Sequence, residues 1–145
     1  MTHRRLERGQ VLPYVAVFLA LVVVPLAVLA VDVVRALYVR THLQTATDAA
    51  CEAAAQAIDA AAFRSSGAER INLGLGAGYA QREFAATVAD QGIVGYGPAL
   101  TAIWLQSPTV VACRATASVH LLIPASPVAL NVSAVSVSEM RVRRR

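Results

Sequence analysis

The 145-residue chain lacks lysine altogether and has only two cysteines, three histidines and a low aromatic content of 6%. Its thirteen basic residues are all arginine, and they concentrate at the two ends of the chain, so that the middle is close to neutral. A nucleic-acid-binding surface needs a basic face with aromatic or polar side chains interleaved. The sequence shows no such face, so we expect no nucleic-acid partner.

The histidines are too scattered to indicate a metal centre. His3, His42 and His120 fall on different parts of the chain, and none pairs with a cysteine or carboxylate at ligand spacing. No serine lies in the sharp strand-to-helix turn that exposes a hydrolase nucleophile. We therefore expect no enzymatic activity, no cofactor, no metal and no small-molecule substrate.

The glycine-rich stretch 74–78 superficially resembles a dinucleotide-binding loop. A true fingerprint follows a strand, opens a helix and is followed by an acidic residue about twenty residues later. Here a helix comes first and no parallel-sheet repeat follows. The stretch is better explained as a flexible loop or as the start of a helix.

The most informative absence is that of charge between Val11 and Val31. At about 1.5 Å per residue, this run matches the thickness of a bilayer's hydrocarbon core, and it predicts one transmembrane helix. Three arginines in the leader at 1–10 favour a cytoplasmic N-terminus, which makes residues 32–145 an extracytoplasmic domain. Pro25 should kink the helix within the span, because it removes one backbone hydrogen bond.

Two other interpretations of this run stay open. A small residue at Ala30, with Val28 two positions earlier, makes signal-peptide cleavage after Ala30 conceivable. The run nevertheless exceeds the core of about 7–15 residues that signal peptides use. The third interpretation is a buried core helix, although so short a chain could hardly surround it. Arg35 and Arg40, soon after the run, also weaken the charge asymmetry that orients the span.

No glycine or proline interrupts residues 32–62, and strong helix formers dominate beyond Thr47. Apolar positions recur at steps of three and four, which predicts that one amphipathic helix continues from the membrane to about Ala62. Its apolar face is mostly alanine, at Ala46, Ala50, Ala53 and Ala57. Small side chains allow close approach, so we expect this packing face to dock on the domain's own sheet or on a neighbouring copy.

Beyond Gly67 the pattern predicts a short helix at 79–91, with Phe84, Ala85 and Val88 inward. Three β-rich segments follow, at 100–106, 109–123 and 128–142, and a proline-flanked turn at 124–127 separates the last two.

In the last segment the apolar alternation shifts phase after Val132, which predicts a bulge or a bend. The predicted class is α+β. A long N-terminal helix is followed by a short helix and a small antiparallel sheet within 100–142. Asn131 and Ser133 form a formal glycosylation acceptor, which we interpret as ordinary strand residues.

Cys51 and Cys113 are far apart in sequence and have no metal-ligand spacing. If residues 32–145 are exported, their compartment permits a disulfide. Closing a loop of about sixty residues would contribute around 4 kcal/mol in the chain-entropy model. Two unrelated small apolar residues are the alternative, and the sequence leaves both open.

Specific residues in the first half of the chain carry a resemblance to a known family. Arg8 and Gly9 precede the apolar run, and Pro25 lies within it. The string Leu-Gln-Thr-Ala-Thr-Asp-Ala-Ala at 43–50 is the most specific signal. Polar and aromatic residues also match at the membrane exit, namely Asp32, Arg35, Tyr38 and Arg40. The first sixty residues thus resemble the N-terminal segment of TadE/TadG-like proteins, the minor pilin-like assembly factors of tight-adherence (Flp) pili.

The resemblance implies a minor pilin-like component in the assembly of a tight-adherence pilus or a related secretion system. Such a protein would be anchored in the bacterial cell membrane. Its partners would be other pilus-assembly or pilin subunits, reached through the N-terminal helix, and membrane lipid. Prepilin-like members are cut after a glycine and carry a glutamate five residues beyond the cut. Counted from Gly9, that place is Tyr14, which favours an uncleaved, TadG-like anchor. The alternative is a small secreted or envelope binding protein, released by cleavage after Ala30.

Overall fold

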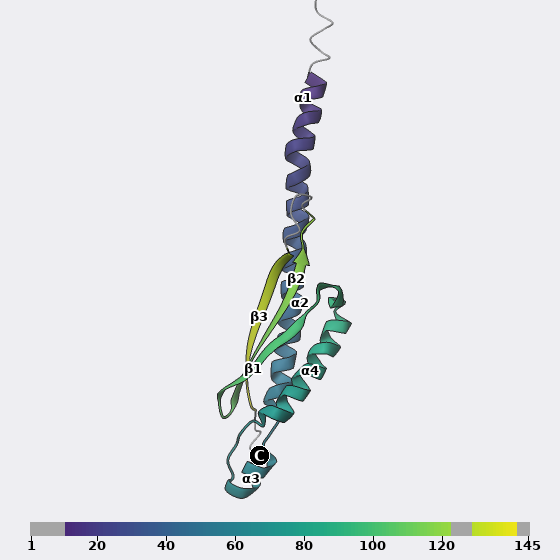
Figure 1. Ribbon diagram of the computed structural model, residues 1–145. Coiled ribbons are helices and arrows are strands. Elements are labelled where there is room, and N and C mark those ends of the chain that lie inside the picture. Colours follow the sequence, from purple (N-terminus) through teal and green to yellow (C-terminus); the bar gives the residue numbers. More distant parts are fainter. Residues whose placement is uncertain (1–10, 123–128, 142–145) are drawn as a thin grey trace, which may run out of the picture.

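A computed structural model describes residues 11–122 and 129–141 of the chain. The basic leader at 1–10, the turn expected at 124–127 and the arginines at 143–145 lie outside the described residues. Within the described part, a long helix projects from a small α+β head, and this confirms the expected fold class (Figure 1).

The long helix is built from α1 (Val11–Phe18), η2 (Leu19–Val23) and α2 (Val24–Ala55), which follow one another without a break. The middle segment η2 is a π-helix, in which the amide of Val24 donates to the carbonyl of Leu19. Pro25 is the second residue after η2 and has no N–H to donate to the preceding turn, so a regular α-helical ladder cannot continue through this point. The irregularity expected at Pro25 therefore takes the form of a π-turn.

The first half of this helix is not covered by the rest of the described chain. The stretch from Pro13 to Ala55 is long and apolar enough to cross a membrane, and only 6% of its most apolar window is buried. Large side chains such as Leu21 and Leu26 are more than half exposed. The interpretation of the run as a buried core helix is therefore wrong.

The second half ends earlier than expected. We expected a helix through 32–62, but α2 ends at Ala55 and a separate helix, α3 (Ala60–Ser66), follows. The side chain of Asp59 accepts hydrogen bonds from the first amides of α3 and so caps it. Between the helices, the chain pairs with a later segment, with Ile58 bridging to Ile71. These alternative partners for the backbone explain why the run of helix formers is interrupted.

The next helix, α4 (Leu73–Asp90), begins six residues before the expected Tyr79. Asn72 caps it by accepting a hydrogen bond from the amide of Leu75. The glycine-rich stretch 74–78 is therefore the start of a helix and not a loop. Phe84 and Val88 are buried as expected, whereas Ala85, one step further round the helix, is exposed.

After the short η3 (Val94–Tyr96), three strands form an antiparallel sheet in the order β1–β2–β3. The strands are β1 (Ala99–Ser107), β2 (Val110–His120) and β3 (Ala129–Glu139).

The bulge expected in the last strand is absent from the pairing of β2 with β3, which is continuous from Val110 to His120. Instead, Ala134 and Ser136 continue the buried series begun by Val132, while Val135 and Val137 face outward. The phase shift in the sequence thus reflects apolar residues on the exposed face. Irregular register occurs between β1 and β2.

The helices α2 and α4 lie side by side and run in opposite directions (Figure 1). The hydroxyl of Tyr38 donates to the carbonyl of Gln91 at the end of α4, while Gly76 at its start meets Ala54 near the end of α2. The inward face of the sheet packs on α2 through β2 and β3. The largest fully buried apolar side chains of this core are Val39, Leu43, Ile93, Val111 and Val119.

Candidate functional site

The alanine-rich packing face points into the head. Ala46 and Ala50 are fully buried and Ala57 nearly so, whereas Ala53 is half-buried. A Cβ added to Gly76 of α4 would lie 3.0 Å from the carbonyl oxygen of Ala54. Because alanine and glycine meet at this contact, the backbones of α2 and α4 approach closely.

The two cysteines come together in the core between α2 and β2. Both are free thiols and fully buried. The sulfur of Cys51 lies 3.4 Å from the carbonyl oxygen of Val111 and 3.5 Å from that of Ser136. Hydrogen bonding to Cys51, together with burial, raises the pKa of Cys113, whereas the hydrogen bond from Cys113 lowers the pKa of Cys51. The pair predicted from the sequence is thus adjacent, and its oxidation stays a prediction.

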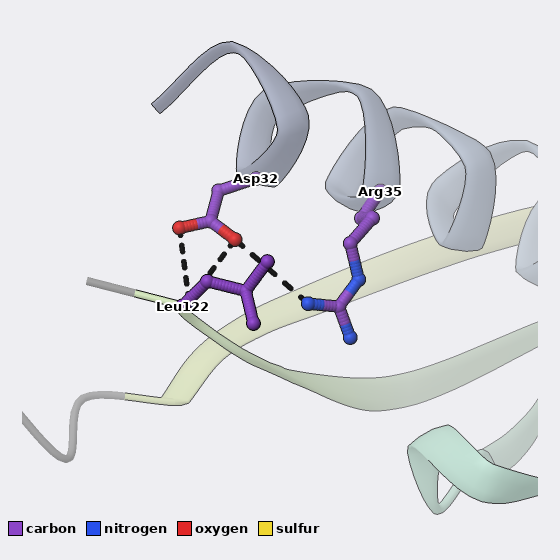
Figure 2. A network of polar contacts seen from close by, with 3 residues as sticks. All are labelled: Asp32, Arg35 and Leu122. Carbon is purple, nitrogen blue, oxygen red and sulfur yellow. Dashed lines mark hydrogen bonds and ion pairs between the residues drawn. The ribbon is translucent and has the colours of Figure 1, made fainter. Parts of the chain in front are cut away.

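Asp32 forms a polar junction where the helix enters the head (Figure 2). Its carboxylate oxygens accept the backbone N–H of Leu122 at 3.1 and 3.0 Å, and Arg35 lies 3.8 Å away. Asp32 is 2% exposed, so an unpaired carboxylate here would be costly. The junction therefore ties the segment that follows β2 to the helix, one residue after the uncharged run.

A groove of about 620 Å³ runs beside this junction, between α2 and the ends of β2 and β3. Its helical wall follows one face of α2, because its members recur at steps of three and four residues along the helix. These wall residues are Leu29, Asp32, Val33, Ala36, Leu37 and Arg40. The opposite wall is Leu121 together with residues 130–133. Asn131 and Ser133 of the formal glycosylation acceptor thus lie in β3 at this groove.

A second groove, of about 650 Å³, lies at the other end of α2 and β3. It contains Asp48, Glu52 and Glu139 together with Arg141, so its charged residues are mainly acidic. Among the described residues, no group of three or more histidines, cysteines or carboxylates could hold a metal ion. His42 instead packs edge-on against Tyr38, with ring centroids 4.2 Å apart, and His120 is exposed at the end of β2.

Comparison with known proteins bears on the long helix. Residues 9–57 match the family model described as "Putative Flp pilus-assembly TadE/G-like". The chain carries a TadE/G-like segment. The match covers the whole of α1, η2 and α2 and stops before the other helices and the sheet. No curated protein and no solved structure matches the chain.

The TadE/G-like segment thus comprises the apolar half of the helix, Asp32 and Arg35 of the junction, and the packing face. The sequence pointed to the helix and to the alanines, but it missed the role of Asp32 and the groove beside it. One signal was available, namely an acidic residue directly after the long uncharged run. The sequence could not identify the partner of Asp32, because Leu122 is ninety positions away and contributes only a backbone amide.

Proposed function

We propose that the protein is a membrane-anchored, minor pilin-like component in the assembly of a tight-adherence pilus or a related secretion system. The observation that carries this proposal is the TadE/G-like match over residues 9–57, which falls on a helix whose first half is apolar and uncovered. Such a helix fits a single-pass anchor. No enzymatic role is proposed.

In this proposal the N-terminus is cytoplasmic and the α+β head lies outside the cell membrane. The anchor is retained uncut, because Tyr14 stands where a processed prepilin would carry a glutamate. The partners are pilin or pilus-assembly subunits that contact the N-terminal helix.

The first test combines membrane fractionation with reporter fusions after Arg145. We expect the protein in the inner-membrane fraction and activity from a reporter that works only outside the cytoplasm. Activity from a cytoplasm-only reporter would reject the orientation. Loss of pili when the chain is deleted, with recovery on re-expression, would support the assembly role.

The second test is the intact mass of the mature chain. An anchor that keeps residues 1–10, apart from loss of Met1, agrees with the proposal. A dominant N-terminus at Gln10 would show prepilin-type cleavage. An N-terminus at Val31 in the soluble fraction would favour the alternative, a small secreted or envelope binding protein.

A further inference from the structure

We propose that the groove beside Asp32 is a lipid site that holds an acyl chain of an anionic phospholipid, with the headgroup phosphate on Arg40. The inference rests on the proposed membrane anchor and goes beyond it. It places the end of the head nearest to the uncharged run within the outer leaflet and gives the groove one occupant.

The position of the groove along the helix is the first argument. Leu29 lines it and also belongs to the uncharged run, so the groove continues the lipid-facing surface of the span without a gap. From Pro13 to Arg40 the helix rises about 40 Å, which is close to the thickness of a bilayer including its headgroup regions. If Pro13 lies at the inner surface, Arg40 reaches the outer headgroups.

The exposed side chains around the groove form the second argument. On the helix, Val33, Val34 and Leu37 are all at least half exposed although they follow Asp32. Opposite the helix, Leu130 of β3 lines the groove and is 45% exposed, and Leu122, two residues after β2, is 54% exposed at the same end of the head. Apolar side chains on both walls, at the exit of a membrane span, match the surroundings that lipid chains provide.

The charges form the third argument. Asp32 is the only acidic residue among those lining the groove, and it is buried and bonded to Leu122 and Arg35. This pairing lets a carboxylate lie at the edge of the leaflet without facing lipid. Arg40 is exposed at the far end, where a long basic side chain can reach a phosphate while its stem stays on apolar surface. Tyr38, 48% exposed, lies at the same level, as interfacial aromatic residues do.

The test uses the full-length chain in nanodiscs that contain a phosphatidylglycerol with a photoreactive acyl chain. After irradiation, peptide mass spectrometry locates the labelled residues. We expect label in peptides that contain Leu37 and Leu130, in addition to the span. Leu130→Gln should reduce labelling of the β3 peptide about fivefold, because it removes an apolar wall of the groove.

Val135→Gln is the matched control, because Val135 lies on the same strand with 47% exposure but faces away from the groove. It should leave labelling unchanged. Leu37→Gln, on the exposed helical wall, serves as the second variant if Leu130→Gln unfolds the head. Equal loss in Val135→Gln and the groove variants would overturn the proposal.

Native mass spectrometry tests the headgroup contact. Arg40→Gln should reduce the preference for phosphatidylglycerol over phosphatidylcholine about fivefold, as expected for the loss of one basic residue near an anionic surface. The control is Arg82→Gln, on α4 at the other end of the head, which should leave the preference intact.

The outcomes separate the lipid site from the anchor. If the chain does not enter nanodiscs at all, the anchor itself fails and the lipid site falls with it. If the chain inserts but label is confined to residues 13–31, the anchor stands and the lipid site is rejected. Protein–protein crosslinks from a photoreactive residue at Leu130, without lipid adducts, would assign the groove to a second copy and would equally reject it.

Discussion

The two halves of the long helix differ in the size of their apolar side chains more than in their apolar character. The first half, to Val31, carries large side chains such as Leu21 and Leu26 that nothing in the described chain covers. The second half buries mostly alanine, as at Ala46 and Ala50. Large exposed residues suit a lipid solvent, whereas small buried residues suit close packing against another backbone. If the helix is the proposed membrane anchor, residue size marks where it passes from lipid to protein surroundings.

This difference has a consequence for stability. An alanine buries little apolar area, so the head depends on a few larger side chains and on the closeness of its elements. Leu43 and Val39 are the largest fully buried residues that α2 contributes. The predictions that follow probe this contrast, from the largest expected effect to the smallest.

The largest effect concerns the cysteine pair that joins the buried half of the helix to the sheet. In an oxidising compartment, Cys51 and Cys113 should lose two protons and two electrons to a dithiol–disulfide oxidoreductase and form a disulfide. The bond should raise the free energy of unfolding by about 4 kcal/mol in the chain-entropy model. Intact mass shows whether the disulfide has formed, and denaturant titration with and without reductant measures its effect on the free energy of unfolding.

Cys51→Ser is the control for oxidation, because its unfolding should no longer respond to reductant. The raised pKa of Cys113 adds an independent check. It should make that thiol slow to alkylate in the folded, reduced protein and fast once the protein is denatured. A purified envelope form that keeps both thiols free would show that the pair is simply part of the core.

The second prediction compares one leucine from each half of the helix. Leu43→Ala should destabilise the head by about 2–5 kcal/mol, because Leu43 is fully buried and its removal leaves a cavity. Leu21→Ala, where the side chain is 71% exposed, should leave the head's melting temperature unchanged. Thermal unfolding of both variants in detergent gives the answer. A comparable loss in Leu21→Ala would mean that the apolar half also supports the head.

The contrast also explains which features of the structure could be predicted from the sequence. The apolar run and the alanine face follow from local patterns, and Phe84 and Val88 were recognised as inward from helical periodicity. The end of α2 was not foreseeable, since Asp59 as a cap competes with helix formers on both sides and the pairing with Ile71 is non-local. The continuous β3 was misread because Val135 and Val137 are apolar yet exposed. The groove combines residues about ninety positions apart and was invisible for the same reason.

The third prediction tests the packing face of the buried half. Ala50→Leu should cost about 1–3 kcal/mol, because three more carbons must be fitted into a fully buried site. Ala49→Leu, one step round the helix and only half-buried, should cost noticeably less. Chemical denaturation of the two variants, with pilus counts in cells, measures stability and assembly together. Equal and negligible effects would contradict docking of this face.

The smallest expected effect is a change in stability that should have opposite signs when two glycines of α4, Gly76 and Gly78, are each replaced by alanine. An alanine normally stabilises a helix interior by about 0.5–1 kcal/mol relative to glycine. Gly78→Ala should show this gain, because its new Cβ meets nothing within 4 Å.

At Gly76 the same Cβ would lie 3.0 Å from the Ala54 carbonyl and 3.5 Å from the Cβ of Ala57. The contact with a backbone atom cannot be relieved by a side-chain rotation, so α4 must move away from α2. We therefore expect Gly76→Ala to cancel the propensity gain and to destabilise the head by about 1 kcal/mol. Urea titrations of the two variants measure whether the free energy of unfolding rises for Gly78→Ala and falls for Gly76→Ala. If both changes stabilise the head, the two helices have room to separate, and their close approach is not what holds the buried half in place.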